Sequence, residues 1–235
     1  MIANGAQYTG IIPEFLQQIE QKTHCHFAYS LVPKNRQEIL FESAQADLLI
    51  TAVKTERRDR FGIFVPLIQL RATLISVADK HAPILHFKDL FLRSHVRLVV
   101  VRGYDYGTGY QKILDALAAQ GRLSIEPDPL SVARMIKANP QYMTIMSPTI
   151  FSGLLQRELI VADLGGKMRY DMLDELPWME SGIYISKLTL SASEQTLLKS
   201  SMDKLAQTDL IWKAYQRYYP VEVLKIGLRP LEFAR

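Results

Sequence analysis

Apolar residues follow two different periods along the first part of the chain. In residues 11–23 they recur at helical spacing, and the same spacing predicts a helix over residues 36–44. Residues 25–32 alternate and are rich in strand formers, while residues 47–53 carry an almost unbroken apolar run that predicts a strand buried on both faces. The order helix, strand, helix, strand predicts an α/β fold with mostly parallel sheets and crossover helices.

The middle of the chain continues in short strands and helices. Short apolar runs predict strands at residues 72–77, 96–101, 142–146 and 159–164, and residues 125–129 are expected to form a short strand and a turn. Between them we expect one helix with Ser131 as its N-cap and another over residues 150–157. Nearer the end, Ser191 and Glu194 have the spacing of a capping box that begins the closing helices. Residues 221–235 follow no pattern that predicts an element.

A dense charged turn, residues 54–60, follows the apolar run at 47–53. Ligands of open α/β sheets bind just beyond the carboxyl ends of the strands, and arginine can hold a carboxylate through two parallel hydrogen bonds. The turn therefore predicts a site for a small anion. The alternative is a solvated turn whose basic residues pair with Glu56 and Asp59.

A second candidate anion site is the glycine-containing turn at residues 102–109, between the strand at 96–101 and a helical period. A helix N-terminus offers free backbone N–H groups and a favourable dipole for an anion. The glycine spacing does not fit a dinucleotide-binding fingerprint. The alternative is a tight turn in which glycine is needed only for a positive φ.

Composition excludes several classes of function. The chain has 235 residues, 48% of them apolar, and a net charge of only +4 spread along the sequence, which does not favour nucleic-acid binding. The single cysteine, Cys25, leaves no internal disulfide and no cysteine-based metal cluster, and we expect it to be a buried, inert thiol. No residues are spaced for nucleophilic catalysis or metal binding, so no catalytic residue, metal or cofactor is predicted. We find no membrane-spanning stretch and no signal peptide.

Five features in order resemble a known family. They are a glycine-led helix start at residues 10–14 (GIIPE), an Ala-Asp strand at 46–48 (ADL), a Thr-x-x-Arg turn at 55–58 (TERR), and then Phe61 and Pro66. This part of the chain resembles the first lobe of type II periplasmic solute-binding proteins, the extracellular solute-binding family 3 of amino-acid ABC transporters. The resemblance implies a two-lobed α/β fold.

The resemblance also implies roles for residues of the first lobe. The arginine of the Thr-x-x-Arg turn binds the carboxylate of the ligand in that family, which makes Arg58 the expected clamp. Thr55 and the main chain at Ala52 and Val53 would assist it.

In the second lobe the corresponding glycine turn faces the ligand, which implies contacts from Gly103, Tyr104, Tyr106 and Thr108. Ser147 stands where amino-acid binders place an aspartate for the α-ammonium group of the ligand. A buried ammonium group without a counter-charge is costly, so this position argues either against an ordinary α-amino acid as the ligand or for a site that has lost its binding function.

The implied domain organisation has two lobes and two hinge crossings. Lobe one would contain residues 1–77 and 183–235, and lobe two residues 78–182. A return strand at residues 181–187 and a linker at 79–83 place the crossings near Ala78 and Gly182.

The resemblance implies a periplasmic protein that captures a small carboxylate-bearing solute, an amino acid or another organic acid. Such a protein is not an enzyme, and it delivers the solute to the membrane permease of an ABC transporter. The alternative is a ligand-sensing extracellular domain of a membrane receptor kinase or cyclase. Dehydratases acting on prephenate-like acids also resemble this family, but they need a carboxylic acid as general acid, and no residue stands out for that role.

One feature of the family is missing from this sequence. A hydrophobic strand normally precedes the short hairpin that we expect at Asn4–Gly5, and it is absent here, so the chain is expected to be truncated. An exposed gap in a sheet invites pairing with another chain, which predicts a homo-oligomer.

Overall fold

A computed structural model describes residues 2–4, 7–78 and 83–232. The chain forms two compact units, and it passes between them after Gln69, Trp178, Tyr218 and Leu228. Unit 1 contains Met1–Gln69, Met179–Tyr218 and Arg229–Arg235, and unit 2 contains Leu70–Trp178 and Tyr219–Leu228. The predicted lobe boundaries and hinge crossings stay predictions. Residues 5–6 of the predicted hairpin and 79–82 of the predicted linker lie outside the described residues.

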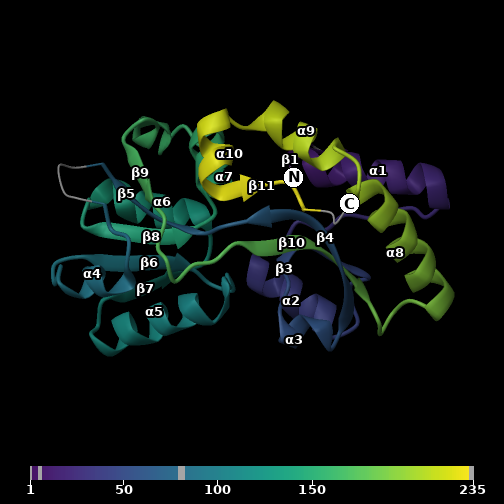
Figure 1. Cartoon of the computed structure of the whole chain (residues 1–235), viewed down its shortest axis with the longest axis horizontal. Helices are drawn as coiled ribbons and strands as arrows, with labels where there is room; N and C mark the ends of the chain where they lie inside the picture. Colours follow the sequence, from purple (N-terminus) through teal and green to yellow (C-terminus); the bar gives the residue numbers. More distant parts are fainter. Residues whose placement is uncertain (1, 5–6, 79–82, 233–235) are drawn as a thin grey trace. The chain divides into compact units, whose positions relative to one another are not determined.

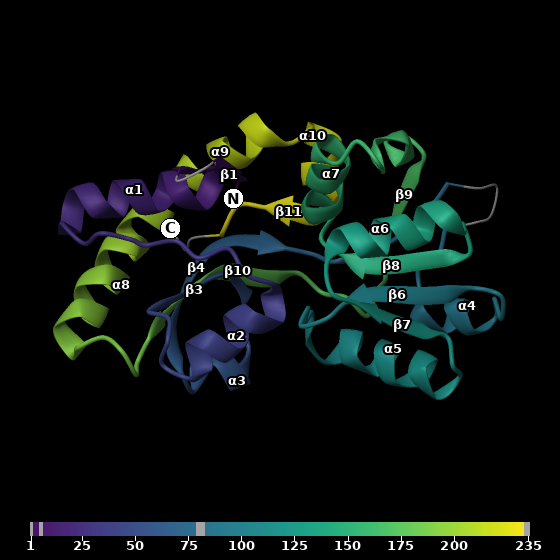
Figure 2. The same ribbon diagram turned by 180° about the vertical axis from the view of Figure 1, so that it is seen from behind.

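Unit 1 combines a hairpin, a four-stranded sheet and helices (Figure 1). Its elements are β1 (Ile2–Asn4), β2 (Gln7–Thr9), α1 (Ile11–Thr23), α2 (Lys34–Glu42), β3 (Leu48–Val53), α3 (Glu56–Asp59), β4 (Gly62–Leu70), β10 (Met179–Ser186), α8 (Ala192–Ala206), α9 (Leu210–Tyr218) and the end of β11 (Leu228–Arg229). α1 lies beside α8 and α9, and Figure 2 shows the three helices on one side of the unit. Phe15, Leu16 and Ile19 of α1 are buried, as their helical spacing predicts, and the capping box of Ser191 and Glu194 is confirmed.

The prediction that residues 47–53 form a strand buried on both faces of a parallel sheet is wrong. The sheet order is β11-β4-β10-β3, so β3 lies at an edge among the described strands. Its partner β10 is antiparallel, with Ser181 opposite Val53 and a bulge between Gly182 and Ile183. Thr51 is consequently exposed, although the strand is otherwise apolar. An apolar run shows that a strand has buried positions, but not how many neighbours it has.

Residues 25–32 do not form the predicted strand. Burial does alternate along them, with Cys25, Phe27 and Tyr29 partly buried and their neighbours exposed, but no ladder forms. The N–H of Phe27 instead donates to Oε1 of Glu20, at 2.7 Å. Cys25 is only partly buried, which corrects the expectation of a buried thiol. Alternation favours a strand, but a strand also needs a hydrogen-bonded partner.

Unit 2 contains a five-stranded sheet in the order β7-β6-β8-β5-β9 (Figure 1). β6 pairs in parallel with β7 and β8, whereas β5 pairs antiparallel with β8 and β9, so the sheet is mixed rather than mostly parallel. α5 packs on β7, and α6 packs on β6, β7 and β8. The elements are β5 (Thr73–Val77), α4 (Phe87–Phe91), β6 (Arg97–Val101), α5 (Gly107–Ala119), β7 (Leu123–Glu126), α6 (Pro129–Ala138), β8 (Tyr142–Met146), α7 (Pro148–Arg157), η1 (Ala162–Leu164), β9 (Met168–Asp171) and α10 (Val221–Gly227).

Two local predictions in unit 2 are wrong. Asp128, not Ser131, is the N-cap of α6, since its carboxylate accepts the N–H of Ser131 at 2.8 Å and Pro129 occupies the first turn. Residues 159–164 form a turn and the short helix η1 instead of a strand, and the side chain of Leu159 is 92% exposed. The apolar residues at the start of that run therefore do not mark a buried strand.

Candidate functional site

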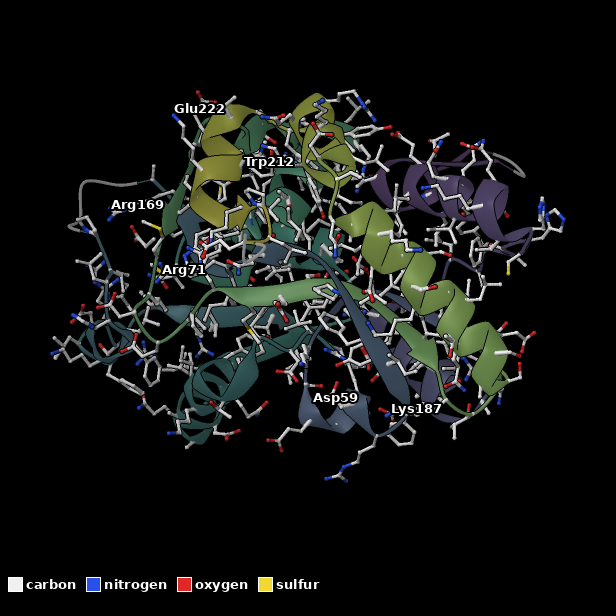
Figure 3. All side chains as sticks on the ribbon, turned by 45° about the vertical axis from the view of Figure 1, so that its right-hand side comes forward. Asp59, Arg71, Arg169, Lys187, Trp212 and Glu222 are labelled. Carbon is white, nitrogen blue, oxygen red and sulfur yellow. The ribbon has the colours of Figure 1, made fainter. Side chains whose placement is uncertain are left out.

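The turn after β3 is held in place by hydrogen bonds to β10 and within the turn itself. Thr55 caps α3, and its Oγ1 accepts the N–H of Arg58 at 3.3 Å. The hydroxyl of Tyr184 on β10 accepts the N–H of Thr55 at 3.1 Å and donates to Oδ1 of Asp59 at 2.8 Å. Nζ of Lys187 donates to the carbonyl oxygen of Asp59 at 2.6 Å, and Figure 3 shows both residues at this end of unit 1. Arg58 therefore projects from a fixed backbone.

The guanidinium group of Arg58 makes three hydrogen bonds within unit 1. Its Nε donates to Oε2 of Glu38 at 3.1 Å and its Nη2 to Oε1 of Glu38 at 2.8 Å, which is the bidentate geometry of an arginine on a carboxylate. Nη1 donates to the carbonyl oxygen of Val53 at 2.6 Å. Arg58 is 5% and Glu38 6% exposed, so the pair is buried. The predicted clamp thus already holds a carboxylate, supplied by α2.

Lys34 adds a second cation beside this pair. Its Nζ lies 3.7 Å from Oε1 of Glu38 and donates to the carbonyl oxygen of Ile50 at 3.4 Å. The pKa of Lys34 is lowered to about 8, mainly by burial and in part by Arg58, while Glu38 opposes the shift. The three residues, called here the Lys34–Glu38–Arg58 cluster, carry two positive charges and one negative charge when Lys34 is protonated.

The lowered pKa of Lys34 predicts that the contribution of Lys34 to stability, the difference between the unsubstituted protein and Lys34→Met, grows as the pH rises from 7.5 to 9.5. Above pH 8 folded Lys34 loses its proton, while the unfolded chain keeps it up to about 10.5. The unfolded state then binds more protons, so the free energy of unfolding rises, by about 2 kcal/mol across this interval. Urea unfolding at both pH values measures the change. Lys34→Met should abolish the rise, and an equal rise in that variant would contradict the prediction.

Glu38 is the residue that sequence reasoning missed at this site. Lys34, Glu38 and Phe41 are four and three residues apart, which places them on one face of α2, and Phe41 is buried. That spacing was the available signal that Glu38 points inward. The alternative prediction, a solvated turn, fits Arg57: its side chain is 66% exposed, and its Nη2 lies 2.7 Å from Oε1 of Glu42. The carboxylates of Glu38 and Glu42, which pair with Arg58 and Arg57, both come from α2.

The glycine turn of unit 2 also has an internal carboxylate. Gly103 has a φ of 81°, so a positive φ accounts for that glycine. At the start of α5, the N–H of Gly107 donates to Oδ1 of Asp105 at 2.8 Å. Thr108, in the first turn of α5, is exposed. Asp105 therefore takes part of the helix N-terminus that was predicted to hold an external anion.

Tyrosines of the same turn pack into an aromatic group with Tyr110. Tyr106 is buried between Tyr104 and Tyr110, with ring centroids 6.1 and 5.2 Å apart in edge-to-face geometry. Burial, and secondarily Asp128, raises the pKa of Tyr104 to about 12. These contacts bring Tyr104 and Tyr106 together, with Tyr106 as a core residue.

Ser147 lies against this aromatic group. Its N–H donates to the hydroxyl oxygen of Tyr106 at 3.2 Å, and its Oγ lies 2.9 Å from Oγ1 of Thr149. Ser147 is 2% exposed. Its polar groups are thus hydrogen-bonded within unit 2, so Ser147 and Tyr106 form a packed contact there.

Within residues 2–4, 7–78 and 83–232, no three His, Cys, Asp or Glu side chains are grouped so that they could hold a metal ion. None of the helices in that part of the chain is long and apolar enough to cross a membrane.

Comparison with known proteins identifies the fold. No family model matches the sequence, and no curated protein matches it either. Among solved structures, the substrate-binding protein of an amino acid ABC transporter is 15% identical, with a TM-score of 0.67 over 93% of this chain and 92% of that one. A histidine kinase sensor domain similar to periplasmic binding proteins is 14% identical, with a TM-score of 0.67 over 89% and 85%. The GluRIIB protein of Drosophila muscle, in complex with glutamate, is 15% identical, with a TM-score of 0.69 over 92% and 91%.

The chain therefore has the type II periplasmic-binding-protein-like α/β fold, with two mixed sheets flanked by helices. The neighbours are binding and sensing proteins, and their common feature is the fold. At such low identity the fold alone is shared, because one fold can carry different functions.

Proposed function

We propose that this protein binds a small carboxylate-bearing solute and is the periplasmic solute-binding component of an ABC transporter, without enzymatic activity. The observation that carries the proposal is Arg58, whose fixed guanidinium group already grips a carboxylate in bidentate geometry at the end of β3. Thr55 and the main chain at Ala52 and Val53 would complete the contact in unit 1. The turn with Gly103, Tyr104, Tyr106 and Thr108, together with Ser147, would contribute from unit 2.

The class of solute follows from the charges near these residues. Neither Ser147 nor Thr149, which follow β8, has a carboxylate. The N–H of Ser147 donates to Tyr106, and its hydroxyl group is hydrogen-bonded to Thr149. An α-ammonium group would lack a counter-charge there. A small organic acid without an ammonium group fits better than an ordinary α-amino acid.

The second candidate is a ligand-sensing extracellular domain of a membrane kinase or cyclase. It is supported by the histidine kinase sensor domain, which has the same TM-score, 0.67, as the transporter protein. A membrane-spanning segment next to this sequence in the full gene would favour the sensor, and a neighbouring permease gene would favour the transporter.

In either role we propose that the two lobes close on the solute by hinge motion at crossings near Ala78 and Gly182. Small-angle scattering should then show a smaller radius of gyration when the solute is added. An unchanged radius with bound solute would count against hinge closure.

We also propose that the chain self-associates through the edge of β3. No other described strand pairs with that edge, and residues 25–32 form no ladder. Light scattering at high protein concentration tests this proposal, and a monomer there would contradict it.

The test of solute binding is a thermal-shift screen against dicarboxylates, other small organic acids and amino acids. A ligand at a hundredfold excess over its dissociation constant should add about 2.7 kcal/mol of stability. The double variant Glu38→Met and Arg58→Met should lose the shift, and it removes the Arg58–Glu38 pair together, so neither of these two residues is left as an unpaired buried charge. A shift that persists in the double variant would exclude Arg58 from the site, and a screen without any hit would contradict solute binding.

A further inference from the structure

We infer that Glu38 regulates ligand binding at the proposed carboxylate site, because its carboxylate holds the place on Arg58 that an external carboxylate would take. A ligand then binds Arg58 only in exchange for Glu38, and Glu38 stays paired with Lys34. The inference rests on the proposed function of Arg58 and names what regulates it.

The geometry at Arg58 makes Glu38 a competitor for the external ligand. Both oxygens of its carboxylate accept from Arg58, at 2.8 and 3.1 Å, and the third guanidinium nitrogen donates to Val53. An external carboxylate in the same side-on bidentate geometry needs the same two nitrogens. Because both side chains are at most 7% exposed, an external group cannot be added beside Glu38 without moving it.

The charges of the cluster make the exchange feasible. Lys34 and Arg58 supply two positive charges, and Glu38 supplies one negative charge, so a second carboxylate would neutralise the cluster. Lys34 lies one helical turn before Glu38 and already pairs with it, with its Nζ 3.7 Å from Oε1, so Glu38 keeps this partner when it leaves Arg58. The exchange therefore leaves neither Glu38 nor Arg58 as an unpaired buried charge, which would be costly.

This arrangement predicts opposite effects of two substitutions on the binding of acetate, used here as the probe. Glu38→Ala removes the competitor and leaves space beside Arg58, so acetate should bind at least about tenfold more tightly than to the unsubstituted protein. Lys34→Met removes the partner that Glu38 keeps after displacement, so acetate binding to Arg58 should weaken by at least about tenfold. Calorimetric titration with acetate at constant ionic strength measures both, and sodium chloride serves as the anion control.

Glu42→Ala is the matched control, since Glu42 lies four residues further along α2 and pairs with the exposed side chain of Arg57 instead of Arg58. It should bind acetate like the unsubstituted chain. If Glu38→Ala fails to fold, Glu38→Gln keeps the shape, removes the negative charge and should also strengthen acetate binding. Equal acetate affinity in the Glu38 and Glu42 variants, or unchanged affinity in Lys34→Met, would overturn the inference.

The acetate titration and the solute screen can fail separately. Acetate binding that depends on Glu38 would support the exchange even if the screen finds no natural solute, in which case only the proposed function fails. A solute that binds through Arg58 with equal affinity in Glu38→Ala and the unsubstituted protein would support the function and overturn the exchange.

Discussion

Arg58→Ala is expected to lower the free energy of unfolding by about 3 kcal/mol, at the lower end of the 3–5 kcal/mol typical of breaking a buried ion pair. The substitution leaves the carboxylate of Glu38 buried without its bidentate partner and the carbonyl oxygen of Val53 without its donor. Lys34, 3.7 Å from Glu38, still neutralises part of the charge of the Glu38 carboxylate, so we expect a loss at the lower end of the 3–5 kcal/mol range. Urea unfolding followed by circular dichroism measures the loss.

The double variant Glu38→Met and Arg58→Met is the control for this prediction. Replacing both buried charges by apolar side chains of similar length should cost far less than removing one of them. A loss in the double variant as large as in Arg58→Ala would show that side-chain packing, rather than the unpaired carboxylate, causes the effect.

Gly182→Ala is expected to cost about 3 kcal/mol or more, because a Cβ on this residue would lie 1.9 Å from the carbonyl oxygen of Val65. The same Cβ would lie 3.0 Å from Cα of Pro66, so β4 and β10 would have to separate. These contacts are with backbone atoms, which cannot rotate away as a side chain can. Chemical unfolding of the variant measures the cost.

Gly121→Ala separates this clash from backbone strain. Gly121 has a φ of 64°, and nothing lies within 4 Å of an added Cβ. Alanine there should cost only about 1–2 kcal/mol, the penalty for a left-handed conformation. Similar losses at Gly121 and Gly182 would contradict the clash as the cause.

Local sequence patterns predicted the elements whose signals lie within a few residues. The helical spacing of α1, the capping box of α8 and the apolar runs of β6 and β8 each depend on neighbours along the chain. The resemblance predicted the fold for the same reason, since its motifs are short and occur in the family's order. Arg58 was singled out because it belongs to one of these motifs.

The tertiary structure decided what depends on partners distant in sequence. Residues 25–32 alternate like a strand but form no ladder, and β3 is an edge strand because β10 is the only described strand that pairs with it. Arg58 is paired with a carboxylate 20 positions away, on a helix whose inward face contains Lys34 and Glu38. The sequence by itself determined which side chains could bind a carboxylate. Only packing, which buries charged groups and so forces them to pair, decided that Glu38 occupies that place.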